Sequence, residues 1–228
     1  MRATAPTGAE NATDVHGDLR ARILSLALPP GSQLSRSELQ AAYGLSSTPV
    51  RDALLRLQEE GLVDIYPQSR TLVSRIDLGQ AREAHFLRSS VEQSIVRRLA
   101  SERNGELVRK LEHITFLQID CEAANDLAGF ASLDLTFHRT LFDAAGMMRL
   151  HGVIRRESVH IDRLRALHLP MGDKTKRILD EHRAIIEAIA AGAPDHADAA
   201  MAFHLSQSIT IAKELSRSRP DYFVPGPF

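Results

Sequence analysis

The stretch "SSTPVRDALLRLQEEG", residues 46–61, predicts a short amphipathic helix. Its serine and threonine residues suit the start of a helix, and Pro49 falls in the first turn, where a missing N–H is harmless. Gly61 can end the helix in a left-handed conformation. Apolar residues recur at helical spacing and form one buried face: Val50, Leu54 and Leu57. The opposite face and the N-terminal end are polar, so this end of the helix is free to contact a partner.

The flanking sequence predicts a winged helix-turn-helix. A helix over roughly 16–27 ends at the "PPG" of residues 29–31, and a second helix over 36–43 is capped by Ser35 or Ser37. Gly44 makes the turn into the helix that starts the quoted stretch. Downstream, "LVDIYP" and "TLVSRI" alternate apolar and polar residues around the turn "QSR", which predicts a β-hairpin.

In such a fold the second helix of the pair enters the DNA major groove by its N-terminal end. Hydroxyl groups and a guanidinium can contact phosphates or base edges there. The predicted DNA-contacting residues at this end are Ser46, Ser47, Thr48 and Arg51, with Arg36 and the hairpin's Arg70 at its sides. The competing interpretation is that these arginines are ordinary solvent-exposed residues that bind nothing, since exposed arginines are common.

Composition restricts the class of protein. The 228 residues carry a net charge of −1, so a nucleic-acid surface has to come from charge placement. No apolar run approaches the roughly 20 residues of a membrane span, and the N-terminus lacks the apolar core of a secretory signal. The single cysteine, Cys121, fits a reducing, cytoplasmic compartment. Residues 1–13 are expected to be a disordered tail, followed by a DNA-binding domain over 14–76.

The remainder of the sequence predicts an all-α bundle over residues 77–220, followed by a tail over 221–228. Long segments of helical periodicity are separated by short breaks such as Pro170–Gly172 and Gly192–Pro194. The fold class is thus mainly α, with an N-terminal winged helix-turn-helix before about six helices. We expect these helices at roughly 78–102, 105–124, 127–145, 148–168, 173–191 and 194–217.

Within the bundle, "LDLTFHRTLF" (133–142) places Asp134 and His138 four residues apart, on one helical face beside apolar residues. His182 and His204 have similar settings in later helices. One acid and three histidines form a reasonable ligand set for Zn²⁺, or for another divalent metal such as Ni²⁺ or Mn²⁺. The alternative is a set of hydrogen-bonded core residues, because a single histidine near a core is usually not a ligand.

The residues from "LPPGSQLSRSELQ" through "TLVS" (28–74) resemble the DNA-binding domain of the GntR family of transcription regulators. Three positions depart from the family's usual pattern. Ser47 stands where an arginine is usual, Arg70 where a glycine is usual, and Arg36 where an acid is common. The resemblance therefore implies an operator-binding protein, while Arg36 and Arg70 are expected to replace a missing contact.

The C-terminal half is similar to the FCD domain of the FadR-type branch of that family, through "FLRSSVE" (86–92), "DLTFHRTLF" (134–142), "DEHRAIIEAI" (180–189) and "FHL" (203–205). The resemblance implies that Asp134, His138, His182 and His204 hold a metal. It also implies that Arg88, which pairs with Glu92 in the family pattern, binds the carboxylate of an effector. Arg163, in "HIDRLR", is a further candidate for effector contact.

Together these patterns predict a homodimeric regulator that binds an inverted-repeat operator in double-stranded DNA. A small organic acid bound at the metal site would control it, with repression the commoner behaviour in the family. Two alternatives stay open: a metal-dependent enzyme acting on a small carboxylic acid, and a structural DNA-binding protein whose second domain binds nothing. The absence of a clear general base beside the ligands disfavours the enzyme.

Overall fold

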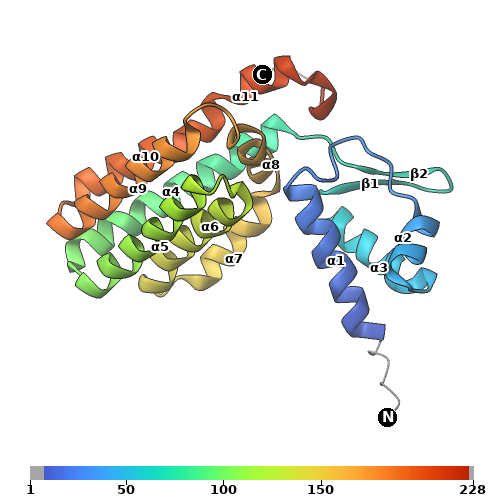
Figure 1. Ribbon diagram of the computed structural model, residues 1–228, viewed down its shortest axis with the longest axis horizontal. Helices are drawn as coiled ribbons and strands as arrows, with labels where there is room; N and C mark the ends of the chain where they lie inside the picture. The colour runs from blue at the N-terminus through green and yellow to red at the C-terminus, as the bar shows by residue number, and fades with distance from the viewer. Residues whose placement is uncertain (1–7, 226–228) are drawn as a thin grey trace, which may run out of the picture. The chain divides into compact units, whose positions relative to one another are not determined.

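A computed structural model describes residues 8–225, with side chains from residue 15 onward (Figure 1). The chain forms two compact units. One comprises the residues up to Leu78 together with the C-terminal segment from Ser216, and the other comprises Gly79–Leu215. The predicted fold class, a winged helix-turn-helix followed by an all-helical region, is confirmed.

The first unit is built around the predicted helix pair. Its elements are α1 (Gly8–Leu24), α2 (Arg36–Tyr43), α3 (Ser47–Glu59), β1 (Val63–Tyr66) and β2 (Arg70–Val73). The Ser35 hydroxyl caps α2 by accepting a hydrogen bond from the Glu38 backbone N–H at 3.3 Å. Gly44 follows α2 with φ +66°, a left-handed conformation that suits glycine. The turn between the two helices is therefore set by local sequence, as predicted.

The core of this unit comes from the apolar faces of its helices and the inner face of the hairpin. Among its fully buried side chains are Leu19, Ile23, Val50, Leu54 and Leu57. At the end of α3, Glu60 accepts from Arg20 of α1 and contacts His16 of α1, each at 2.6 Å. These contacts fix α1 against the start of the hairpin.

Two boundaries at the N-terminal end differ from the sequence prediction. Residues 1–7 of the predicted tail lie outside the described residues, whereas α1 begins at Gly8, well before the predicted start near residue 16. In the hairpin, Arg70 was assigned to the turn but begins β2, opposite Tyr66. Its guanidinium lies 5.2 Å from the centre of the Tyr66 ring, a cation–π contact that extends the strand pairing.

The prediction of a tail over residues 221–228 is wrong for residues 221–225, the part that the structure describes. The Ile76 N–H donates to the Tyr222 carbonyl at 2.8 Å, and the Val224 N–H donates to the Ile76 carbonyl at 3.0 Å. Phe223 is 3% exposed and Ile76 is fully buried. The chain therefore returns after the helical unit and joins the first unit through an isolated parallel β-bridge between Ile76 and Phe223; residues 226–228 lie outside the described residues.

The second unit is a helical bundle. Its helices are α4 (Leu78–Glu102), α5 (Gly105–Ala123), α6 (Leu127–Ala144), α7 (Met148–Glu157), α8 (Val159–His168), α9 (Lys174–Ala191), α10 (Pro194–Thr210) and α11 (Ala212–Ser218). The predicted helix over 148–168 is interrupted at Ser158, whose hydroxyl donates to the Ile154 carbonyl at 2.6 Å. The predicted helix over 194–217 is likewise divided at Ile211.

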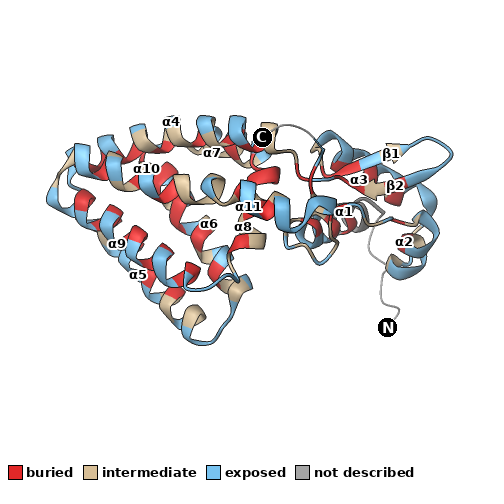
Figure 2. Cartoon of the chain, turned by 90° about the horizontal axis from the view of Figure 1, so that it is seen from above, coloured by how far each residue is buried: buried red, intermediate tan, exposed pale blue. Residues whose placement is uncertain are grey.

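Helices α5, α6, α9 and α10 pack side by side, and their buried residues lie on the faces turned toward one another (Figures 1 and 2). Asn104 and Asp126 cap α5 and α6 through their side-chain oxygens. No helix in the described part of the chain is long and apolar enough to cross a membrane. Most of the buried core is apolar, and several of its buried polar side chains gather in one group, which is the candidate site.

Candidate functional site

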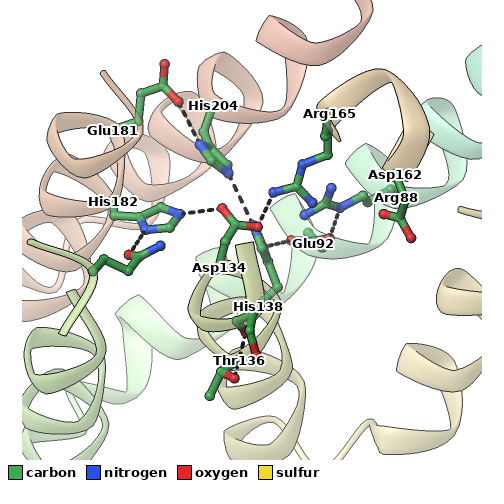
Figure 3. Close-up of polar contacts among 12 residues, drawn as sticks. Arg88, Glu92, Asp134, Thr136, His138, Asp162, Arg165, Glu181, His182 and His204 are labelled. Atoms are coloured by element: carbon green, nitrogen blue, oxygen red, sulfur yellow. Dashed lines mark hydrogen bonds and ion pairs between the residues drawn. The ribbon is translucent and has the colours of Figure 1, made fainter. Parts of the chain in front are cut away.

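The four predicted ligands meet inside the bundle. Helix α6 supplies Asp134 and His138 one turn apart, α9 supplies His182, and α10 supplies His204 (Figure 3). All four residues are buried, and one potential ligand atom from each lies within 4.8 Å of the others. The i,i+4 spacing on α6 and the packing of α9 and α10 thus bring residues 70 positions apart to one point.

The distances between these atoms suit a shared cation. The Nε2 atoms of His138 and His204 are 3.2 Å apart, and His182 Nε2 is 3.6 Å from Asp134 Oδ1. His182 Nε2 and Asp134 Oδ1 are both buried without a hydrogen-bond partner in the described part of the chain. Unpaired buried polar atoms are costly, and a metal ion at their centre would satisfy them. The residues present therefore fit a divalent transition metal.

A second layer of side chains orients the three imidazoles (Figure 3). Each Nδ1 lies within hydrogen-bond distance of an acceptor oxygen: Glu92 Oε2 for His138 at 2.6 Å, Gln118 Oε1 for His182 at 2.9 Å, and Glu181 Oε2 for His204 at 2.8 Å. When Nδ1 donates its proton to such an acceptor, the lone pair of Nε2 is left pointing at the centre of the site. The arrangement selects the tautomer that binds metal.

The electrostatics keep the ligand atoms deprotonated. Burial is the largest cause that lowers the pKa of His182 and of His204 to about 3, and it lowers the pKa of His138 well below its usual value. Burial alone would raise the pKa of Asp134, but Arg165 and the surrounding histidines hold that pKa well below its usual range. Neutral imidazoles and an ionised carboxylate are the forms that coordinate a metal.

Arginines line one side of this cluster. Arg88 Nε donates to Glu92 Oε1 at 2.5 Å, and Arg165 donates to Asp134 Oδ2 (Figure 3). Arg163 is fully buried, and its guanidinium contacts His160 Nδ1 at 2.9 Å and the Val159 carbonyl at 3.3 Å. Of the two predicted effector-contacting residues, Arg88 is thus connected to the ligand His138 through Glu92. The effector role of both residues stays a prediction.

Several members of the site were missed by sequence reasoning. The sequence patterns do not indicate Gln118 or Glu181. Glu181 could have been suspected because it precedes His182, but adjacent helix positions face different directions. Gln118 contacts His182 from another helix, so only the packing of α5 against α9 reveals it.

The predicted DNA-contacting residues cluster at the start of α2 and α3 and on the hairpin. Ser46 precedes α3, while Ser47, Thr48 and Arg51 lie in its first turns; all four are exposed. Arg36 is the first residue of α2 and is also exposed. The side chain of Arg51 forms no ion pair or hydrogen bond with any other described residue. A guanidinium held on a rigid helix with no internal partner is available to an external acceptor.

Comparison with known families matches both halves of the chain. Residues 11–73 match "Bacterial regulatory proteins, gntR family", and residues 83–207 match "FCD domain". The chain belongs to the GntR family. Its helical unit is the FCD domain of that family, which often binds a metal.

Curated relatives that match nearly the whole chain are transcription regulators. An HTH-type transcriptional regulator in an unstable DNA locus of Streptomyces ambofaciens is 32% identical over 95% of this chain and 91% of that protein. The HTH-type transcriptional repressor RspR of Escherichia coli is 28% identical over 90% of each chain. This GntR-family chain is therefore a DNA-binding transcription regulator, and the alternative of an enzyme is excluded.

Solved structures share the fold. The E. coli protein McbR/YncC superposes with a TM-score of 0.75 at 21% identity, covering 90% of this chain and 98% of that one. A GntR regulator from Rhodococcus sp. RHA1 gives a TM-score of 0.73 at 24% identity, covering 90% of this chain and 98% of that one. The architecture of both units is thus that of known GntR regulators.

Proposed function

We propose that this regulator represses transcription as a homodimer and is controlled by a small organic acid bound at a divalent metal in the FCD domain. One observation carries the proposal: three buried imidazoles, each oriented through Nδ1 by its own acceptor, direct Nε2 toward an unpaired carboxylate oxygen of Asp134. A core that only needed to fill space would not hold such a set, because unpaired polar atoms destabilise it.

The proposed metal is Zn²⁺, with Ni²⁺ and Mn²⁺ as the alternatives. Neutral imidazoles and one carboxylate suit zinc and other late transition metals. Asp134, His138, His182 and His204 would hold the ion. When bound, the ion supplies a Lewis acid that attracts a carboxylate oxygen. Arg88, beside His138 through Glu92, would provide a second anchor for the same effector, and Arg163 stays a weaker candidate.

On DNA, the N-terminal end of α3 is proposed to enter the major groove. Ser46, Ser47, Thr48 and Arg51 would contact the operator there, and Arg36 and Arg70 would contact it from the sides. A twofold dimer would read an inverted repeat, and its mass in solution would be twice 25.2 kDa. The names of RspR and of a probable D-xylose utilization operon repressor from Paenarthrobacter nicotinovorans support repression. A regulator of this kind acts on chromosomal DNA, in the cytoplasm.

Metal uptake tests this proposal. Protein purified without a histidine tag should contain about one metal ion per chain. After chelation, added Zn²⁺ should raise the melting temperature, because a ligand that binds only the folded state stabilises it. The His182→Ala variant should lose this rise, while His113→Ala, at an exposed position on α5, should keep it. Wild-type protein that shows neither metal nor a rise would identify the cluster as a polar core.

A further inference from the structure

The charged groups around the four ligands are matched in pairs. Arg88 pairs with Glu92 at 2.5 Å, and Arg165 pairs with Asp134 (Figure 3). Lys174, at the start of α9, lies with its Nζ 3.7 Å from Glu181 Oε1 and is 4% exposed. With the histidines neutral, these three acids and three cations leave the described site with no net charge. Transfer of a proton within one pair would not change that sum.

A divalent cation bound among the ligands adds two positive charges to this balanced site. The charges would be buried, since all four ligands and the side chains of Glu92 and Glu181 are shielded from solvent. Uncompensated charge in a low-dielectric interior is costly, and the charge of a bound ion dominates its surroundings. An effector with one negative charge would compensate half of it, whereas an effector with two would compensate all of it.

The two arginines provide a place for a second acidic group. Among the described residues, Arg88 uses Nε for Glu92, and Arg165 uses one terminal nitrogen for Asp134. Neither guanidinium has a further hydrogen bond or ion pair within the described chain, and the side chains of Arg88 and Arg165 are 9% and 19% exposed. Both guanidinium groups lie beside Asp134 and Glu92 in Figure 3, and both act on His138 and His204 electrostatically. They therefore border the ligand cluster on one side.

We propose that the effector is a dianion of the small dicarboxylic acid class. One carboxylate occupies the open position at the metal, and the second lies against the free N–H groups of Arg88 and Arg165. The N–H groups of a guanidinium match the two oxygens of a carboxylate in geometry. Both ends of the effector therefore have a positively charged partner, the metal at one end and the arginines at the other. The inference rests on the proposed metal and effector site and narrows its ligand from organic acids in general to dicarboxylates.

Matched pairs of acids test this inference on the zinc-loaded, full-length protein at neutral pH. Calorimetric titration compares malonate with propionate, succinate with butyrate, and glutarate with pentanoate. At least one dicarboxylate should bind roughly 10- to 100-fold more tightly than its monocarboxylate of equal length, the factor expected for hydrogen bonds to charged groups. The preference should disappear when zinc is removed by chelation.

Two variants separate the arginine contact from metal binding. Arg88→Gln should reduce the preference for the dicarboxylate while zinc content, measured by elemental analysis, stays near that of the wild type. Arg139→Gln, at an exposed position on α6, should keep the full preference.

Three results would overturn the inference. Equal affinity of the monocarboxylate and the dicarboxylate in all three pairs would show that one charge suffices. Failure of the whole dicarboxylate series to bind zinc-loaded protein would exclude the class. A wild-type protein that takes up no zinc would remove the proposed site itself, and the elemental analysis distinguishes that failure from the first two.

Discussion

At the residue scale, the acceptors behind the histidines matter as much as the ligands. Glu181 accepts from His204 Nδ1 and lies on α9 immediately before the ligand His182. Such a partner fixes the ring orientation and raises the basicity of the coordinating nitrogen. Lys174 lies beside the other oxygen of the same carboxylate. The metal affinity is therefore expected to depend on side chains that never touch the metal.

The Glu181→Gln substitution should weaken Zn²⁺ binding by roughly 10- to 100-fold, the usual effect of removing an outer-shell carboxylate. The amide can still accept from His204, so the fold should persist. Competition with a chromophoric chelator measures the affinity. Glu187→Gln, at an exposed position on the same helix, serves as the control. Equal zinc affinity in the Glu181→Gln variant and the wild type would show that Glu181 has no part in the site.

The four ligands of the site could be predicted from the sequence, but most of the side chains that contact them could not. Asp134 and His138 could be paired in advance because helical spacing alone puts them on one face. His182 and His204 could be added from their apolar settings and from the family resemblance. Gln118 and Arg165 contact the site from other helices, and their contacts depend on helix packing that no local pattern encodes.

At the element scale, α3 combines a buried apolar face with an exposed, hydroxyl-rich N-terminal end. The buried Val50 and Leu54 hold the helix against the core of the first unit. Arg51, between them in sequence, points outward. The helix is therefore rigid where it has to present Arg51, and this favours specific contact over loose attraction to phosphates.

Replacing Arg51 with alanine should weaken operator binding by about 1–3 kcal/mol if the guanidinium reads a base. Fluorescence anisotropy at fixed salt, on DNA selected for binding, measures the change. Gln58→Ala, exposed near the end of the same helix, should have little effect. Unchanged affinity of the Arg51→Ala variant would remove this residue from the interface.

The C-terminal segment that bridges to Ile76 also has a structural role. Phe223→Ala should destabilise the protein by about 3 kcal/mol or more, because truncating a buried phenylalanine leaves a cavity. Val224→Ala is the matched control, since Val224 is 47% exposed. Urea unfolding measures both variants. Equal stability of Phe223→Ala and the wild type would show that this segment adds nothing to the stability of the first unit.

Element boundaries were the least predictable part of the fold. Helix α1 starts at Gly8, in a segment whose composition resembles a tail. The β-bridge at Phe223 could not be predicted because the backbone hydrogen bonds of this segment go to Ile76, far away in sequence. The second error arises because tertiary contacts, rather than local propensity, stabilise the segment around Phe223.

At the scale of the whole molecule, the buried histidines couple stability to pH. In the metal-free protein the pKa of His182 and of His204 is about 3 when folded, against 6.5 for an ordinary histidine. The unfolded chain therefore binds more protons between these values, and the free energy of unfolding should rise with pH through that window. Above about 6.5 this contribution should be constant.

Urea titrations of chelated protein between about pH 5 and 6.5 measure this effect, because ordinary carboxylates are already ionised there. His168, whose pKa burial lowers to about 4, contributes in the same direction. Stability should fall as the pH decreases through this range. The stabilisation by added Zn²⁺ should shrink in parallel, since protons and metal compete for the same nitrogens. A flat profile over this range would mean that the histidines are not buried in neutral form.

The central claim is that the FCD domain of this regulator holds a metal between α6, α9 and α10. Anomalous diffraction at the zinc edge, from crystals of protein loaded with Zn²⁺, tests it most directly. The account predicts one strong peak per chain, within coordination distance of Asp134, His138, His182 and His204. A map with no peak at these four residues, or with its peak elsewhere in the chain, would contradict it.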